Sequence, residues 1–92
     1  MAGNAKGNLE ALENAESQLS KFQRTVESMC ESLESAASSA SSFCKDDTSR
    51  TAITKLNKAI AEIRDALGIV QPVREKIRQI IKDIEEALQV QM

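Results

Sequence analysis

The chain has 92 residues, a formal net charge of −2, 28% charged residues and no His, Trp or Tyr. This length allows one domain, and the nearly balanced charge argues against a protein that binds nucleic acid. Without histidine the chain lacks the usual general base at neutral pH, and no Ser–His or Cys–His pair exists. We therefore predict a protein that is not an enzyme and that holds no cofactor and no metal.

Charge is divided unevenly between the two halves of the chain. Residues 1–47 carry four basic and eight acidic side chains, whereas residues 48–92 carry eight basic and six acidic ones. If the chain folds back on itself, the acidic half attracts the basic half. The alternative is two solvated surfaces whose charges differ by accident.

The first predicted helix runs from about residue 8 to residue 44, with Asn8 as its N-cap. Its apolar residues recur at alternating spacings of four and three, the pattern of helices packed along one seam. The seam positions are Ala15, Leu19, Phe22, Val26, Met29, Leu33, Ala36, Ala40 and Phe43. Residues 35–42 read SAASSASS, and the heptad phase continues through them to Phe43. We expect helix there; a disordered serine linker is the alternative.

Two cysteines, Cys30 and Cys44, share one heptad position that flanks the predicted seam. Fourteen residues of helix separate them by about 21 Å, far beyond the reach of a disulfide. We predict two small buried thiols. A disulfide to a second chain in an oxidising compartment is the alternative.

The predicted turn covers residues 45–49, a polar stretch whose side chains suit a helix N-terminus. Asp47, Thr48 and Ser49 are the candidate N-caps. Since short connections favour antiparallel neighbours, the sequence predicts a helical hairpin.

The second predicted helix runs from about residue 50 to residue 90 and has a wider apolar stripe. Its seam positions are Ile53, Leu56, Ile60, Ile63, Leu67, Val70, Arg74, Ile77, Ile81, Ile84 and Leu88. A flanking stripe adds Ala52, Ala59, Ala66, Val73, Ile80 and Ala87. Three apolar positions per heptad suit a helix that contacts two neighbours, and the hairpin supplies only one.

We therefore predict an all-α fold of two long antiparallel helices, a single domain over residues 1–92, which completes a four-helix bundle by dimerisation. The partner is a second copy or another helical-hairpin protein. The predicted partner interface consists of Ala59, Ile60, Ile63, Ala66, Leu67, Val70, Val73, Ile77, Ile80, Ile81, Ile84 and Leu88.

Two residues interrupt the regular pattern of the second helix. Pro72 removes the hydrogen bond to the carbonyl of Gly68, and because the apolar phase continues beyond it we expect a kink rather than a break. The kink is either tolerated by the packing or serves as a hinge or partner groove. Arg74 is the charged residue within the second seam. We expect it roughly opposite Phe22, where its side chain either covers the ring or extends outward to solvent. A polar residue in a seam commonly sets register or oligomer state.

The sequence predicts neither a Sec signal peptide nor a membrane-spanning segment. The N-terminal MAGNAKGN lacks the apolar run of a Sec signal peptide, and no stretch approaches the ~18 apolar residues that span a membrane. The amphipathic segment 73–92 mixes both charges, which weakens any attraction to anionic lipid. We expect a cytoplasmic protein, or one that is secreted without a cleavable signal peptide.

Length, two long helices and a polar turn at the midpoint make the chain resemble the small helical-hairpin proteins of type VII secretion. These are the WXG family and the WXG-lacking small proteins that accompany LXG toxins. The Trp-x-Gly turn of the family is missing, because the turn here reads Phe43-Cys44-Lys45-Asp46-Asp47. Phe43 and Asp47 match the family's aromatic-x-x-x-acid export signal, although that signal usually follows the hairpin. The alternative is the last core residue of one helix and the cap of the next.

The resemblance implies a secreted factor, or an adaptor that delivers a larger toxin by binding its N-terminal helical domain. The expected function is thus a non-enzymatic interaction protein that pairs with another helical hairpin. The alternatives are a homo-oligomeric coiled-coil scaffold and a regulatory adaptor that holds a partner helix at the Gly68–Pro72 kink, neither with a secretory role.

Overall fold

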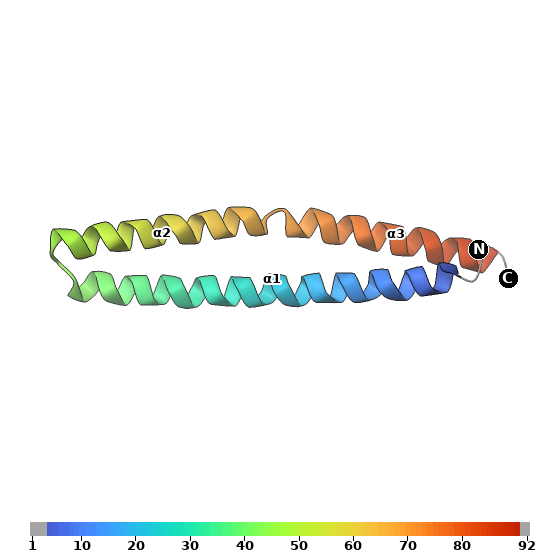
Figure 1. Cartoon of the computed structure of the whole chain (residues 1–92), viewed down its shortest axis with the longest axis horizontal. Coiled ribbons are helices and arrows are strands. Elements are labelled where there is room, and N and C mark those ends of the chain that lie inside the picture. The colour runs from blue at the N-terminus through green and yellow to red at the C-terminus, as the bar shows by residue number, and fades with distance from the viewer. Residues whose placement is uncertain (1–3, 91–92) are drawn as a thin grey trace. The chain divides into compact units, whose positions relative to one another are not determined.

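The computed structural model describes residues 4–90, and within that range it contains only helices and the turns that join them. The helices are α1 (Asn4–Phe43), α2 (Asp47–Leu67) and α3 (Val70–Val90), shown in Figure 1. The predicted all-α class is confirmed. Two compact units divide the described chain: unit 1 comprises residues 4–23 and 69–90, and unit 2 comprises residues 24–68.

Unit 2 is a helix pair closed by a tight turn. The second half of α1 and α2 run antiparallel, and residues 44–46 connect them (Figure 1). Asp46, with an extended backbone (φ −74°, ψ 157°), caps α2 by accepting a 3.0 Å hydrogen bond from the Ser49 backbone N–H. The predicted caps Asp47, Thr48 and Ser49 lie in the first turn of α2 instead, because the cap needs an extended backbone just before the helix.

The serine-rich segment of α1 is helical to its end at Phe43. The Ser42 hydroxyl donates to the Ser38 carbonyl at 3.3 Å, and the Lys45 ammonium donates to the Ser41 carbonyl at 3.1 Å. The Lys45 bond satisfies a carbonyl of the last helical turn that lacks a partner within the helix, whereas the Ser42 bond adds to a carbonyl that the helix already uses. The linker alternative is therefore excluded. At its other end, α1 begins at Asn4, ahead of the predicted cap at Asn8.

Two residues, Gly68 and Ile69, separate α2 from α3. The Gly68 N–H donates to the carbonyls of Arg64 and Asp65, both at 3.1 Å, which ends α2 in a tightened turn. Pro72 is the third residue of α3, in the first turn, where an N–H has no helical acceptor to lose. The structure thus places the interruption just before the proline and gives two helical segments.

The packing seam of α1 differs from the predicted one. Phe22, Met29 and Phe43 are 54%, 58% and 85% exposed, so their predicted burial is wrong. Cys30 and Ala37 are only 1% and 2% exposed. Five of the nine predicted seam positions stay shielded, and the other four move by one residue toward the C-terminus. The seam keeps Ala15, Leu19, Val26, Leu33 and Ala40 and gains Gln23, Cys30, Ala37 and Cys44. Small side chains allow the close approach of helices that bulky residues would prevent.

Candidate interaction surface

A polar cluster joins α1 to α3 inside unit 1. Arg74 donates through Nε to Glu16 Oε1 at 2.7 Å and through a terminal nitrogen to Gln23 Oε1 at 2.6 Å. Arg78 donates to the same Glu16 oxygen at 3.2 Å. Arg74 and Glu16 are largely shielded from solvent, with 14% and 18% of their side chains exposed. Arg74 is thus a seam residue, as predicted, but two polar partners of α1 hold it.

Electrostatics in this cluster favours ionised groups. The hydrogen bond from Arg74 holds the pKa of Glu16 below its ordinary value, and partial desolvation only partly opposes it. Charges of Arg74 and Arg78 act in the same direction. Because one carboxylate serves two guanidinium groups, the cluster is a structural ion network with no proton poised for transfer near neutral pH.

Unit 2 has a polar side, marked by an ion pair between Glu34 of α1 and Arg64 of α2. This contact raises the pKa of Arg64. Every ion pair found within residues 4–90 joins a carboxylate of the acidic half to an arginine of the basic half. The division of charge along the sequence therefore contributes to the pairing of the helices within each unit.

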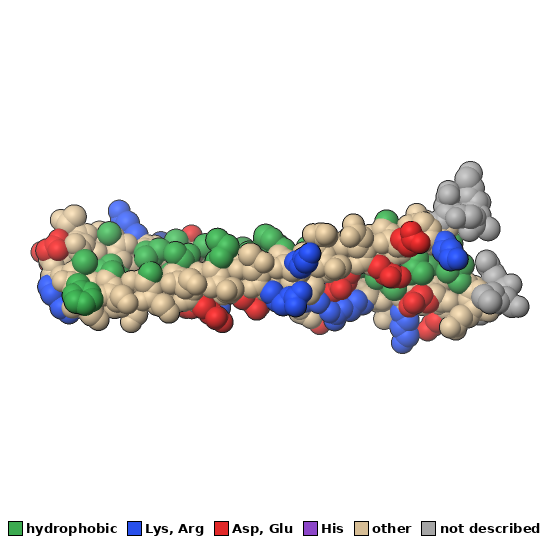
Figure 2. Space-filling view, turned by 90° about the horizontal axis from the view of Figure 1, so that it is seen from below, with side chains coloured by type: hydrophobic (Ala, Val, Ile, Leu, Met, Phe, Trp, Pro, Cys, Tyr) green, Lys and Arg blue, Asp and Glu red, His purple; other side chains and the backbone are tan. Residues whose placement is uncertain are grey.

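The opposite side of unit 2 is apolar and uncovered. A helix turns about 100° per residue, so Met29 and Ala59 lie far around their helices from Glu34 and Arg64. We call this side the apolar face; it consists of Met29, Ala36, Ala52, Ala59, Ile63 and Ala66, all exposed. Figure 2 shows hydrophobic side chains along one long edge of the part of the molecule that contains the turn. Met29 and Ile63 are its large members, 58% and 40% exposed.

The predicted partner interface divides into three groups in the structure. Ile60, Leu67 and Val70 are buried within the chain itself, at 3%, 8% and 9% exposure. Four further members are half-buried: Ile77, Ile81, Ile84 and Leu88. The exposed members are Ala59, Ile63 and Ala66 in unit 2, and Val73 and Ile80 in unit 1. The sequence analysis assigned Met29 and Ala36 to the seam and so missed them as surface residues. They form one stripe with Phe22 and Phe43, at a spacing of seven residues, and all four residues are exposed.

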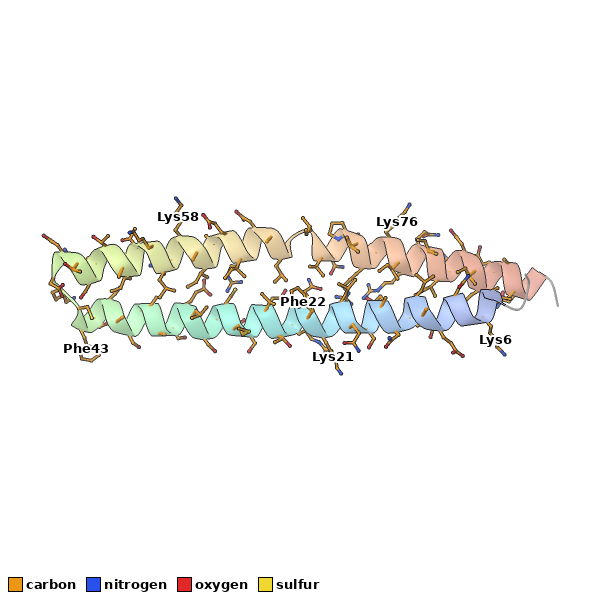
Figure 3. All side chains as sticks on the ribbon, viewed as in Figure 1. Lys6, Lys21, Phe22, Phe43, Lys58 and Lys76 are labelled. Atoms are coloured by element: carbon orange, nitrogen blue, oxygen red, sulfur yellow. The ribbon has the colours of Figure 1, made fainter. Side chains whose placement is uncertain are left out.

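Phe43 and Asp47 lie on either side of the turn. Phe43 is the last residue of α1, and its ring points away from α2 (Figure 3). Asp47 is the first residue of α2 and is exposed. Neither residue has the role that the alternative interpretation gives it, since Phe43 is 85% exposed and the cap of α2 is Asp46.

The remaining features of the described residues offer little chemistry. A shallow pocket on the polar side, beside the turn, is lined by Ser41, Cys44, Arg50, Ile53, Thr54 and Asn57. Both cysteines are free thiols, Cys30 buried and Cys44 half-buried. Among residues 4–90 no three side chains of the metal-binding kinds gather in one place. Nor does any helix in that range have the length and apolar content needed to cross a membrane.

No protein-family model matches the chain, and no curated protein and no solved structure is significantly similar to it. Inference about function therefore rests on the surface described above.

Proposed function

We propose that this chain is a non-enzymatic interaction protein that pairs with another helical hairpin. The apolar face of unit 2 is the observation that carries the proposal. It places two large hydrophobic side chains and four alanines in water along one side of a helix pair. Contiguous exposed apolar surface bounded by polar residues is typical of a site where another protein binds.

The kind of partner follows from how the apolar residues are distributed. Each helix of unit 2 has one apolar stripe toward its neighbour in the chain and a second on the apolar face. Two such directions suit the corner of a four-helix bundle, in which every helix has two neighbours. A second helical hairpin supplies both further helices at once.

We place this pairing in type VII secretion, as a substrate or as an adaptor that brings a larger helical toxin to the secretion machinery. The resemblance in length and helical pattern supports this proposal, together with the exposure of Phe43 and Asp47 beside the turn. An exposed aromatic ring at a helix end is available to a receptor without unfolding of the chain.

Export in a host with the secretion system tests the secretory part of the proposal. We expect Phe43→Ala and Asp47→Ala each to abolish export while helicity and pairing remain, because neither residue caps a helix or lies on the apolar face. Phe22→Ala, which removes an exposed ring elsewhere on α1, is the matched control and leaves export intact. Unchanged export of the first two variants removes the secretory reading.

A homo-oligomeric scaffold with no secretory role is the second candidate, since the apolar face serves it equally well. Sedimentation of the purified chain distinguishes the two. A scaffold forms a stable assembly of more than two copies without a partner, whereas the hairpin-pairing protein stops at two hairpins.

A further inference from the structure

We propose that the occupant of the apolar face is a second copy of this chain, related by a two-fold axis perpendicular to the helices of unit 2. In this arrangement α1 lies antiparallel on α1 of the other copy, and α2 lies antiparallel on α2. The proposal deepens the proposed function, on which it rests, by naming the partner and its alignment.

The apolar face has no cover within unit 2. All six of its members are exposed, and Met29 and Ile63 leave 58% and 40% of their surface in water. Association of two copies covers this apolar surface, and burial of apolar area is the main favourable term in association.

Charges at the edge of the apolar face favour a second copy with this alignment. Lys55 and Glu62, both exposed, lie one helical turn to either side of Ala59, on the outer edge of the apolar stripe of α2. They are seven residues apart and opposite in sign. Antiparallel α2 helices that cross near Ala59 set each Lys55 against Glu62 of the other copy, and this happens twice in the dimer.

On α1, complementary side-chain sizes replace the complementary charges of α2. Met29 and Ala36 are also seven residues apart, one large and one small, so the axis that pairs Lys55 with Glu62 sets each Met29 against Ala36 of the other copy. The corresponding edge of α1 carries Thr25, Ser32 and Ser39, which bear no charge and repel nothing.

The two relations fix one axis rather than two. The midpoint of Met29 and Ala36 on α1 and the midpoint of Lys55 and Glu62 on α2 lie at nearly equal distances along the chain from Lys45, the centre of the turn. In an antiparallel helix pair such positions stand at the same level. A single two-fold axis thus satisfies the size relation on one helix and the charge relation on the other.

The first experiment measures the mass of the full-length chain by sedimentation over a range of concentrations. We expect a dimer for the natural sequence and a monomer for Ala59→Arg, because both copies bring the new side chain to the axis. Ala61→Arg is the matched control: Ala61 is exposed on α2 but lies far around the helix from Ala59, so its variant dimerises normally. Circular dichroism checks that both variants stay helical.

The second experiment exchanges charges. Lys55→Glu and Glu62→Lys each set like charges against one another, and we expect each variant alone to dimerise roughly tenfold more weakly. An equimolar mixture of the two variants regains dimers, as does the double variant, since opposite charges then meet again. Native mass spectrometry of the mixture is expected to show mainly the mixed dimer.

Any other result contradicts a specific part of the proposal. A dimer that Ala59→Arg leaves intact uses another surface, and a dimer whose mixture shows no preference has another alignment. If the natural chain is a monomer that binds a different helical hairpin through the apolar face, the second copy is wrong while the proposed function stands. A monomer that binds no hairpin ends both.

Discussion

The two units of this chain are both antiparallel helix pairs with apolar residues between the helices, yet their polar contacts differ. Unit 1 has a shielded ion network in which Arg74 reaches two polar side chains of α1. Unit 2 has close apolar contact around Cys30, Ala37, Ile60 and Leu67, and its ion pair lies at the surface. The network depends on geometry and ionisation, whereas the apolar contact depends on buried area.

The contrast shows that one helical pattern can both fix the register of the helices and stabilise their packing. Arg74 reaches Glu16 and Gln23 together in one alignment of the helices, so the network selects register more than it adds stability. The small residues of unit 2 permit close approach, which adds stability without selecting a register as strictly. Three variants test this division, beginning with the largest expected effect.

Ile60→Ala should destabilise the protein most, by about 3 kcal/mol, since it removes a side chain that is 3% exposed and leaves a cavity. Urea unfolding of the full chain at one fixed protein concentration measures the loss. Ile69→Ala, at a site that is 69% exposed, is the matched control and should change stability by less than about 1 kcal/mol. Equal losses would contradict the apolar account of unit 2.

Ala37→Leu should cost about 2 kcal/mol, because the added atoms have no space at a position that is 2% exposed. Its neighbour Ala36 is exposed, so Ala36→Leu leaves the single chain as stable as before when unfolding is followed at a protein concentration too low for the proposed dimer to form. Thermal unfolding followed by circular dichroism compares the two. If Ala36→Leu were instead the less stable variant, the seam would pass through Ala36, as the sequence predicted, and not through Ala37.

Acid should weaken unit 1 through Glu16, with the smallest effect of the three. Its pKa is lowered in the folded chain by Arg74, so its contribution is complete above about pH 4.5, the ordinary value, and disappears as the pH falls through the lowered pKa. As the pH falls from above 4.5 through the lowered pKa of Glu16, we expect the Tm of the natural chain to fall by a few degrees more than the Tm of the Glu16→Gln variant.

Hydrogen exchange assigns that loss to a unit. Amides of α3 should exchange faster in acid for the natural chain than for Glu16→Gln, relative to each protein at neutral pH. Asp46 has a lowered pKa as well, but its partner is Ser49 in unit 2. An acid response confined to the first turn of α2 would place the sensitive group there instead.

Periodicity alone predicted the helical class, the turn near residue 45 and the presence of a charged seam residue. It failed to choose between two neighbouring stripes of α1, since Phe22 and Met29 are one residue away from Gln23 and Cys30. Hydrophobicity favours the larger side chains, whereas the structure turns the smaller ones inward so that the helices can approach.

The polar network of unit 1 was recognisable only in part. Arg74 interrupts an apolar seam and was visible for that reason. Glu16 and Gln23 gave no signal, because they are ordinary polar residues on a helix until the alignment of α3 selects them. The cap at Asp46 was missed by one residue for a similar reason: four adjacent polar side chains suit a cap, and only the backbone angle selects among them.

The two free thiols provide a built-in reporter of how unit 2 opens. Cys44, half-buried beside the turn, should react quickly with a thiol reagent, whereas Cys30, 1% exposed, should wait until the helices separate. The ratio of the two labelling rates thus measures the frequency of opening without any engineered probe.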